Sequence, residues 1–231
     1  MKSTSGSERE KRNAGESAAD LVSDGDVVGL GTGSTTAYTV RRLGERIREE
    51  GLEIRGIPTS YQSRQIAVEE GIPLTSLDVE TPDIDIDGAD QFDDDLSLVK
   101  GGGAAHLREK IVASASDRVV IVADESKYSE ALDYPVPVEV VGDAAEVVES
   151  RLSDMGGDPE LREAERKDGP VVTDNGNLVL DVDFGEFEAS RLGSRISEVP
   201  GVVEHGVFEG IADEVHIGKE DGVDVEKRQN G

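Results

Sequence analysis

The sequence predicts an α/β protein with a parallel sheet, joined to a second, smaller α+β region. Two observations lead to this fold class. From residue 27 to residue 123, short apolar segments alternate with helical segments of about 10–15 residues. After Pro135 the order changes to strand, helix, two strands, helix and strand, which is typical of a split βαβ unit. We therefore expect a Rossmann-like domain over residues 1–133 plus 209–231 and a ferredoxin-like domain over residues 134–208.

The elements of the first region follow from caps, apolar periodicity and glycine breaks. Ser7 and Glu10 form a capping box that opens a helix with an alanine-rich inner face, and Asp24-Gly25-Asp26 ends it. Asp93-Asp94-Asp95 reads as a solvated turn. The later elements are strands at 27–30, 54–58, 73–74, 84–87, 96–99 and 118–123, and helices at 36–50, 61–70 and 104–116.

The second region shows a stronger turn signal. Asn175-Gly176 is typical of a tight β-hairpin and separates the strands expected at 171–173 and 178–184. Around it we expect strands at 137–141, 161–166 and 202–208 and helices at 144–155 and 187–196. Residues 215–217 would return to the first sheet, and the last ten or so polar residues are expected to fray.

Composition excludes several classes of function. The 24 basic and 51 acidic residues give a formal charge of −27, which argues against nucleic-acid binding because phosphate backbones need a basic surface. Apolar runs are too short to span a membrane, and the start of the chain lacks the apolar core of a secretory signal. The absence of cysteine removes disulfides and thiolate sites. We expect a soluble, cytoplasmic protein.

The acidic residues are dispersed along the chain, so they would repel one another in dilute buffer. Molar salt shortens the screening length to about 3 Å and removes that penalty. The sequence therefore suggests adaptation to a high-salt (halophilic) cytoplasm. An acidic protein from an ordinary cytoplasm is the alternative.

A glycine-rich loop follows the first strand. Residues 29–35 read Gly-Leu-Gly-Thr-Gly-Ser-Thr, and such a loop before a helix can cradle a phosphate with amides and hydroxyls. It is a poor dinucleotide fingerprint, since Ser34 replaces the third glycine and no acid ends the next strand. It also lacks the Gly-Lys-Ser/Thr of a nucleotide P-loop. A purely structural turn is the alternative.

Two further segments carry charged groups beside glycines. Asp87-Gly88-Ala89-Asp90 follows a strand, where two carboxylates could share a site, although chance pairs are common in so acidic a chain. Lys100 precedes Gly101-Gly102-Gly103, which can form an anion-binding nest at a helix start. Glu109 lies further into that helix, where it could equally pair with Arg108 or Lys110 on the surface.

Other candidates are weaker. Lys127 follows a strand and could meet a phosphate or simply be solvated. The three histidines show no metal-ligand spacing, and His106 reads as an ordinary helix residue.

In their order and spacing, these segments resemble the ribose-5-phosphate isomerase type A family from about Lys11 to Ile217. The resemblance rests on residues 29–35, 87–90, 100–105 with 108–110, and the segment Val-Val-Thr-Asp-Asn-Gly-Asn at 171–177. It implies a metal-independent, cofactor-free isomerase of the pentose phosphate pathway that interconverts ribose 5-phosphate and ribulose 5-phosphate through an enediolate.

The resemblance also implies residue roles. Glu109 falls on the catalytic base, and Asp87 and Asp90 on the acids that handle hydroxyl protons and ring opening. Lys100 and the amides of Gly101, Gly102 and Gly103 fall where the enediolate oxygens are held. The remaining substrate-binding positions are Thr32, Gly33, Ser34, Thr35, Gly88, Ala89, Lys127 and Lys11.

One position departs from the family pattern: Gln91 follows Asp90 where the family often has an acid. Two alternatives share the fold, an amino-sugar-phosphate deaminase and a sugar-phosphate-binding sensor. A sensor should lack Lys100 or Glu109 and carry a basic DNA-binding segment, and this chain does neither. The family further suggests a homodimer or homotetramer.

Overall fold

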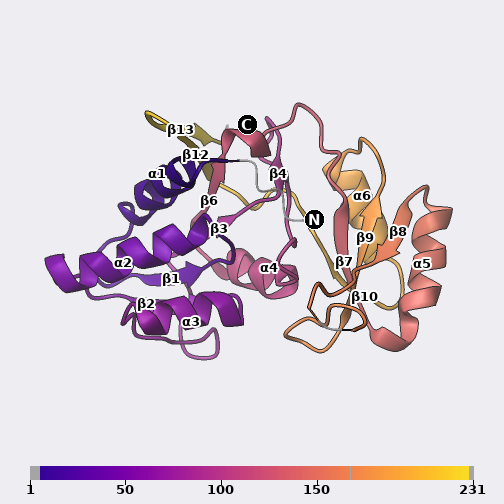
Figure 1. Cartoon of the computed structure of the whole chain (residues 1–231), viewed down its shortest axis with the longest axis horizontal. Helices are drawn as coiled ribbons and strands as arrows, with labels where there is room; N and C mark the ends of the chain where they lie inside the picture. Colours follow the sequence, from indigo (N-terminus) through magenta and orange to yellow (C-terminus); the bar gives the residue numbers. More distant parts are fainter. Residues whose placement is uncertain (1–5, 167, 229–231) are drawn as a thin grey trace. The chain divides into compact units, whose positions relative to one another are not determined.

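A computed structural model describes residues 6–166 and 168–228, which form two compact units (Figure 1). The larger unit comprises residues 6–89, 108–128 and 210–228, and the smaller comprises residues 90–107 and 129–209. The division predicted from the sequence, at residues 133/134 and 208/209, stays a prediction about independent domains.

The larger unit contains a six-stranded sheet. Its order is β13-β12-β6-β3-β1-β2, and all neighbours are parallel except β13, which pairs antiparallel with β12 at the edge. The parallel strands confirm the α/β class. Their bounds are β1 Val27–Leu30, β2 Arg55–Pro58, β3 Ile84–Gly88, β6 Val119–Asp124, β12 Glu214–Lys219 and, antiparallel, β13 Gly222–Lys227.

Helices cover both faces of this sheet, because adjacent strand residues point to opposite sides. Val28 packs into a core with α1 (Glu8–Ala19) and α2 (Thr36–Glu50), which supply Ala14, Ala18 and Leu43. Val27 instead packs with Ile57 and with Val112 of α4 (His106–Ala115). The unit also contains α3 (Tyr61–Glu69) and the short 3-10 helix η1 (Glu125–Lys127).

The smaller unit has the predicted strand–helix order. Its four-stranded antiparallel sheet has the order β10-β7-β9-β8, the arrangement of a ferredoxin-like unit. A three-stranded sheet, β11-β5-β4, accompanies it. The elements are β4 Gln91–Phe92, β5 Leu98–Val99, β7 Val136–Val140, η2 Gly142–Ala144, α5 Ala145–Asp154, β8 Asp158–Leu161, β9 Leu178–Asp183, α6 Ala189–Ser197, β10 Val202–His205 and β11 Val207–Phe208.

Several predicted boundaries are wrong. Residues 222–227 form β13 rather than a frayed end, because a hairpin from β12 supplies hydrogen-bond partners that polar alternation alone does not reveal. The strand expected at 161–166 ends at Leu161, and the strand expected at 171–173 makes only the single bridge Val172–Leu178. Residues 73–74 likewise contribute one bridge, Gly56–Leu74. The strand expected at 202–208 divides at Gly206 between two sheets.

Among residues 6–166 and 168–228, no helix has both the length and the apolar character needed to cross a bilayer.

Candidate active site

The loop between β1 and α2 is held to the neighbouring strand ends by Thr32. Its amide donates to Asp87 Oδ1 (3.0 Å), and its hydroxyl lies 2.9 Å from Thr59 Oγ1 and 2.7 Å from Ser60 Oγ. These strands are parallel and adjacent, so their carboxyl ends bring residues distant in sequence to one edge. Thr32 and Asp87 belong to the same site predicted from the sequence, and the structure joins them by a hydrogen bond. The sequence prediction missed Thr59 and Ser60, because the end of the strand before them was considered only for its lack of an acid.

The rest of this loop is partly open to solvent at residues 33–35. Ser34 is exposed, while Gly33 and Thr35 are partly buried. Thr35 precedes α2 without capping it through its side chain. Its hydroxyl is therefore available to a ligand at the helix N-terminus, as a phosphate cradle requires.

Asp87 ends β3 and is 1% exposed. Its Oδ1 accepts from the amides of Thr32 (3.0 Å) and of Gly88 (2.7 Å). A carboxylate held by two backbone donors has a fixed orientation, so Asp87 is placed at the sheet edge by the backbone itself.

Glu109 belongs to the first turns of α4 and is 3% exposed. The surface role that the sequence left open for Glu109 is thus wrong, although the adjacent Arg108 is exposed. A buried carboxylate is costly unless its surroundings compensate it, so its burial marks Glu109 as a candidate for chemistry.

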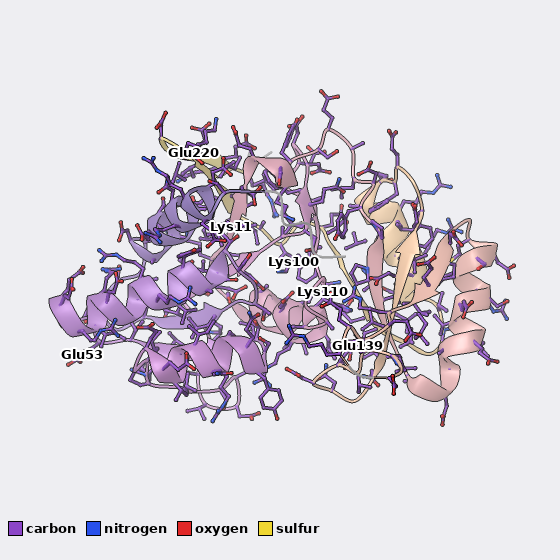
Figure 2. All side chains as sticks on the ribbon, in the orientation of Figure 1. Lys11, Glu53, Lys100, Lys110, Glu139 and Glu220 are labelled. Carbon is purple, nitrogen blue, oxygen red and sulfur yellow. The ribbon has the colours of Figure 1, made fainter. Side chains whose placement is uncertain are left out.

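The larger unit holds two of the predicted site lysines, which come from different elements. Lys11 lies on α1 (Figure 2). Its side chain is buried, with 8% of the residue exposed. Lys127 ends η1, directly after β6, and is partly buried. Asp124 caps η1 by accepting from the Ser126 amide (3.1 Å), which fixes the turn that carries Lys127.

In the smaller unit, Lys100 leads into the glycine turn and is 4% exposed. Its backbone amide donates to the Gly206 carbonyl (2.8 Å), and its Nζ lies 5.4 Å from the centre of the Phe208 ring. Such a contact is a cation–π interaction. It holds the ammonium group beside β11.

The turn after Lys100 closes through a hydrogen bond from the Ala104 amide to the Gly101 carbonyl (2.9 Å). Gly101 has φ +108°, a conformation that side chains disfavour, and a Cβ there would lie 2.8 Å from His106 Nδ1. His106 itself is fully buried against this turn.

Asp90 is anchored to the same turn. Its amide donates to the Val99 carbonyl (2.8 Å), and its Oδ2 accepts from the Gly102 amide (2.7 Å). The prediction that all three glycine amides face a ligand therefore needs correction, because Asp90 engages the Gly102 amide. The amides of Gly101 and Gly103 make no hydrogen bond within the described part of the chain.

The structure adds two residues for which the sequence carried no signal. Arg162, expected in a strand, lies in the loop after β8, where its Nη1 donates to the Gly101 carbonyl (2.9 Å). Its Nε donates to Asp181 Oδ2 (2.7 Å), and its Nη2 donates to Asp181 Oδ1. Nearby, the pKa of Tyr134 is raised by burial and by the negative charges of Asp90 and Asp181, an effect that Arg162 opposes.

The departure at Gln91 also has a structural reason. Its Nε2 donates to Asp133 Oδ1 (2.6 Å), while its Oε1 accepts from the amides of Asp133 and Tyr134 (both 2.9 Å). A carboxylate could accept from the two amides but could not donate to Asp133. Gln91 therefore holds the segment before β7.

Over residues 6–166 and 168–228, no three His, Asp or Glu side chains gather in a way that could hold a metal ion.

Comparison with known proteins identifies the family of the chain. The family model for ribose 5-phosphate isomerase A (phosphoriboisomerase A) matches residues 55–222, more than half of the chain. The chain belongs to the ribose 5-phosphate isomerase A family. The expectation of an isomerase is confirmed, and the match favours it over the deaminase and the sensor.

Relatives in the ribose 5-phosphate isomerase A family cover nearly the whole chain. Ribose-5-phosphate isomerase A of Natronomonas pharaonis is 62% identical over 97% of this chain and 100% of the relative. That of Haloarcula marismortui is 55% identical over 95% and 96%. These are halophilic archaea, which agrees with the salt adaptation expected from the charge.

Solved structures of the family share the fold. Ribose 5-phosphate isomerase A from Methanocaldococcus jannaschii has 45% identity and a TM-score of 0.92, covering 94% of this chain and 98% of that one. A D-ribose-5-phosphate isomerase in complex with phospho-erythronic acid has 39% identity and a TM-score of 0.94, covering 96% and 100%.

Proposed function

We propose that the chain interconverts D-ribose 5-phosphate and D-ribulose 5-phosphate through an enediolate, within the pentose phosphate pathway. Family membership over nearly the full chain supports the substrate. Burial of both Glu109 and Lys100, side chains that are rarely buried, supports their roles in the chemistry and is the observation that carries the proposal.

The reaction moves two protons and needs no cofactor. A base removes the proton from C2 of the open-chain aldose, the C–H electron pair forms the C1=C2 bond, and the carbonyl electrons move onto O1. The proton then returns at C1, while the hydroxyl proton of O2 is transferred to O1, so that O1 becomes a hydroxyl and O2 becomes the ketone oxygen. Atoms and charge balance, provided that one group carries the carbon-bound proton and another moves protons between the oxygens.

We assign the carbon-bound proton to Glu109. A helical carboxylate withdrawn from water is a stronger base toward a C–H bond than a solvated one, because its charge is less stabilised. The oxygen-bound protons, and opening of the sugar ring, are assigned to Asp87 and Asp90. Backbone amides fix the orientation of both carboxylates, so neither must be ordered when substrate binds.

Negative charge develops on O1 and O2 as the enediolate forms. Lys100 is the cation assigned to it, with donors from the Gly101–Gly103 turn. The amides of Gly101 and Gly103 remain available as donors, because the Gly102 amide already donates to Asp90. Loss of one such donor typically costs about 10²–10³ in rate.

The remaining predicted residues are assigned to substrate binding. Thr32, Gly33, Ser34 and Thr35 precede the N-terminus of α2, which favours an anionic or hydroxylated group. Gly88 and Ala89 complete the turn between the two acids. Lys127 and Lys11 supply positive charge for the phosphate. The family neighbour with phospho-erythronic acid supports a sugar-phosphate substrate, because that ligand combines a phosphate with a carboxylate whose two oxygens resemble an enediolate.

The test is isomerisation of ribose 5-phosphate in about 3 M KCl with excess EDTA, because molar salt screens the acidic surface. We expect the wild type to turn over and Glu109→Gln to lose at least about 10³ in kcat while still binding the sugar phosphate. In D2O the wild type should incorporate deuterium at C1 of ribulose 5-phosphate, and Glu109→Gln should not.

Glu149→Gln is the matched control, because Glu149 is an exposed glutamate on α5. It should keep the wild-type rate. Near-normal turnover by Glu109→Gln would remove Glu109 from the role of base. An inactive wild type would remove the proposed reaction, and loss of turnover in EDTA would contradict metal independence.

We also propose that the chain acts in the cytoplasm as a homodimer or homotetramer. Light scattering after gel filtration in about 3 M KCl measures the mass directly, and a monomer would overturn the proposal.

A further inference from the structure

The guanidinium of Arg162 connects a carboxylate of the smaller unit's sheet to the glycine turn. Two of its nitrogens bind both oxygens of Asp181 on β9, the bidentate geometry that fixes an arginine most firmly. The arginine side chain is 16% exposed, so solvent competes little for its donors. The orientation of the guanidinium is thus set from the sheet side.

Its third nitrogen points at the turn. Nη1 donates to the Gly101 carbonyl at 2.9 Å and lies 3.4 Å from the Gly102 carbonyl. The Gly101 carbonyl also accepts from the Ala104 amide, so both of its lone pairs are used. Rotation of the Gly101–Gly102 peptide would break both bonds.

The other end of that peptide holds Asp90. The N–H of Gly102 donates to Asp90 Oδ2 at 2.7 Å. A cation at a peptide carbonyl polarises the peptide and strengthens its N–H as a donor. Asp181, Arg162, the Gly101–Gly102 peptide and Asp90 therefore form one continuous chain of hydrogen bonds, and every group in it lies in the smaller unit.

We propose that Arg162, held by Asp181, is a positioning residue for the isomerisation: it sets the glycine turn and, through the Gly102 amide, the orientation of Asp90. The proposal rests on the proposed function, because it concerns the enediolate step. Arg162 touches no reacting atom. Its effect should appear when charge develops on O1 and O2 of the substrate, and much less when the ground-state sugar phosphate binds with those oxygens uncharged.

The test compares kcat with KM for Arg162→Met, which keeps most of the side-chain volume and removes the donors. We expect kcat to fall about 30-fold with KM within about threefold, since a hydrogen bond to a charged group is worth a factor of this order. Arg162→Lys keeps the charge but cannot bind Asp181 in two places and also reach the turn, so it should recover only part of kcat.

A second readout separates positioning from folding. Phospho-erythronic acid places a carboxylate where the enediolate oxygens would lie, whereas ribitol 5-phosphate carries neutral hydroxyls there. Arg162→Met should weaken inhibition by the first about tenfold or more and change the second by less than about threefold. A merely structural role would weaken both equally.

Arg151→Met is the matched control, because Arg151 is an exposed arginine on α5. It should leave all these constants unchanged. The inference is overturned if Arg162→Met keeps the wild-type kcat, or if both inhibitors weaken together. A wild type without ribose 5-phosphate isomerisation would instead refute the proposed function, so the two failures are distinguishable.

Discussion

The buried carboxylate of Glu139 on β7 accepts hydrogen bonds from three side chains of the hairpin loop at residues 173–177. Glu139 is fully buried, and its Oε1 accepts from Thr173 Oγ1 (2.8 Å), Asn175 Nδ2 (3.0 Å) and Asn177 Nδ2 (2.9 Å). The Asn-Gly motif predicted a tight turn. The structure shows that the polar side chains of this loop point inward and bind one oxygen, Glu139 Oε1. Replacement by glutamine tests whether the negative charge stabilises this loop.

The magnitude follows from the three bonds. Hydrogen bonds to a charged group contribute about 1.5–3 kcal/mol and neutral ones about 0.5–1.5, so Glu139→Gln should forfeit about 1 kcal/mol for each bond. Relief from burying a charge offsets part of this sum. We expect a net loss of about 2 kcal/mol in the free energy of unfolding, equivalent to about 4–8 °C for a chain of this length.

Thermal unfolding followed by circular dichroism in about 3 M KCl measures the effect. The shift should persist at higher salt, because ions screen buried groups poorly. The exposed Glu149→Gln should move the midpoint by less than about 2 °C. A midpoint for Glu139→Gln equal to that of Glu149→Gln would refute the reasoning, since the charge would then contribute nothing to the loop.

Three further predictions concern the charge, a buried histidine and a close backbone contact. Secondary structure should be lost below about 0.5 M KCl, and full stability in dilute buffer would contradict salt adaptation. Burial lowers the pKa of His216, although Glu214 opposes this shift. Below about pH 6.5 the unfolded state therefore binds more protons than the folded state, and the free energy of unfolding should fall by at most about 1.4 kcal/mol per pH unit. His216→Gln should flatten that slope in melting curves measured across this pH range. At Gly206 a Cβ would lie 2.1 Å from the Lys100 carbonyl oxygen. Gly206→Ala should therefore lower the free energy of unfolding by about 1–3 kcal/mol and reduce turnover. A Gly206→Ala variant that melts and turns over like the wild type would contradict this, because the backbone would then have moved to make room.

The sequence predicted elements best where periodicity and caps agree. The capping box at Ser7 is present, with Ser7 Oγ accepting from the Glu10 amide (3.1 Å). Strands 27–30 and 84–87 are recovered to within a residue, because buried parallel strands are continuous apolar or glycine-bounded runs. Strand β13 was missed, since an edge strand with polar alternation is defined by its partner and not by its composition.

Site residues divide in the same way. The local motifs singled out Asp87 and Lys100 as candidates, because each lies beside a glycine turn or a strand end, whereas the family resemblance singled out Glu109. They gave no sign of Arg162, whose importance depends entirely on which carbonyl it meets. They also suggested three available glycine amides, whereas Asp90 takes one.

The sequence by itself determined the α/β class, the strand–helix order of both regions, the family and the residues that bear charge. These properties depend on local periodicity, turn chemistry and residue type, which short segments carry within themselves. Only the tertiary structure decided that Glu109 is buried rather than superficial, that Thr59 and Ser60 join Thr32, and that Arg162 reaches the glycine turn. Burial and long-range hydrogen bonds depend on which segments meet, and no single segment encodes its partner.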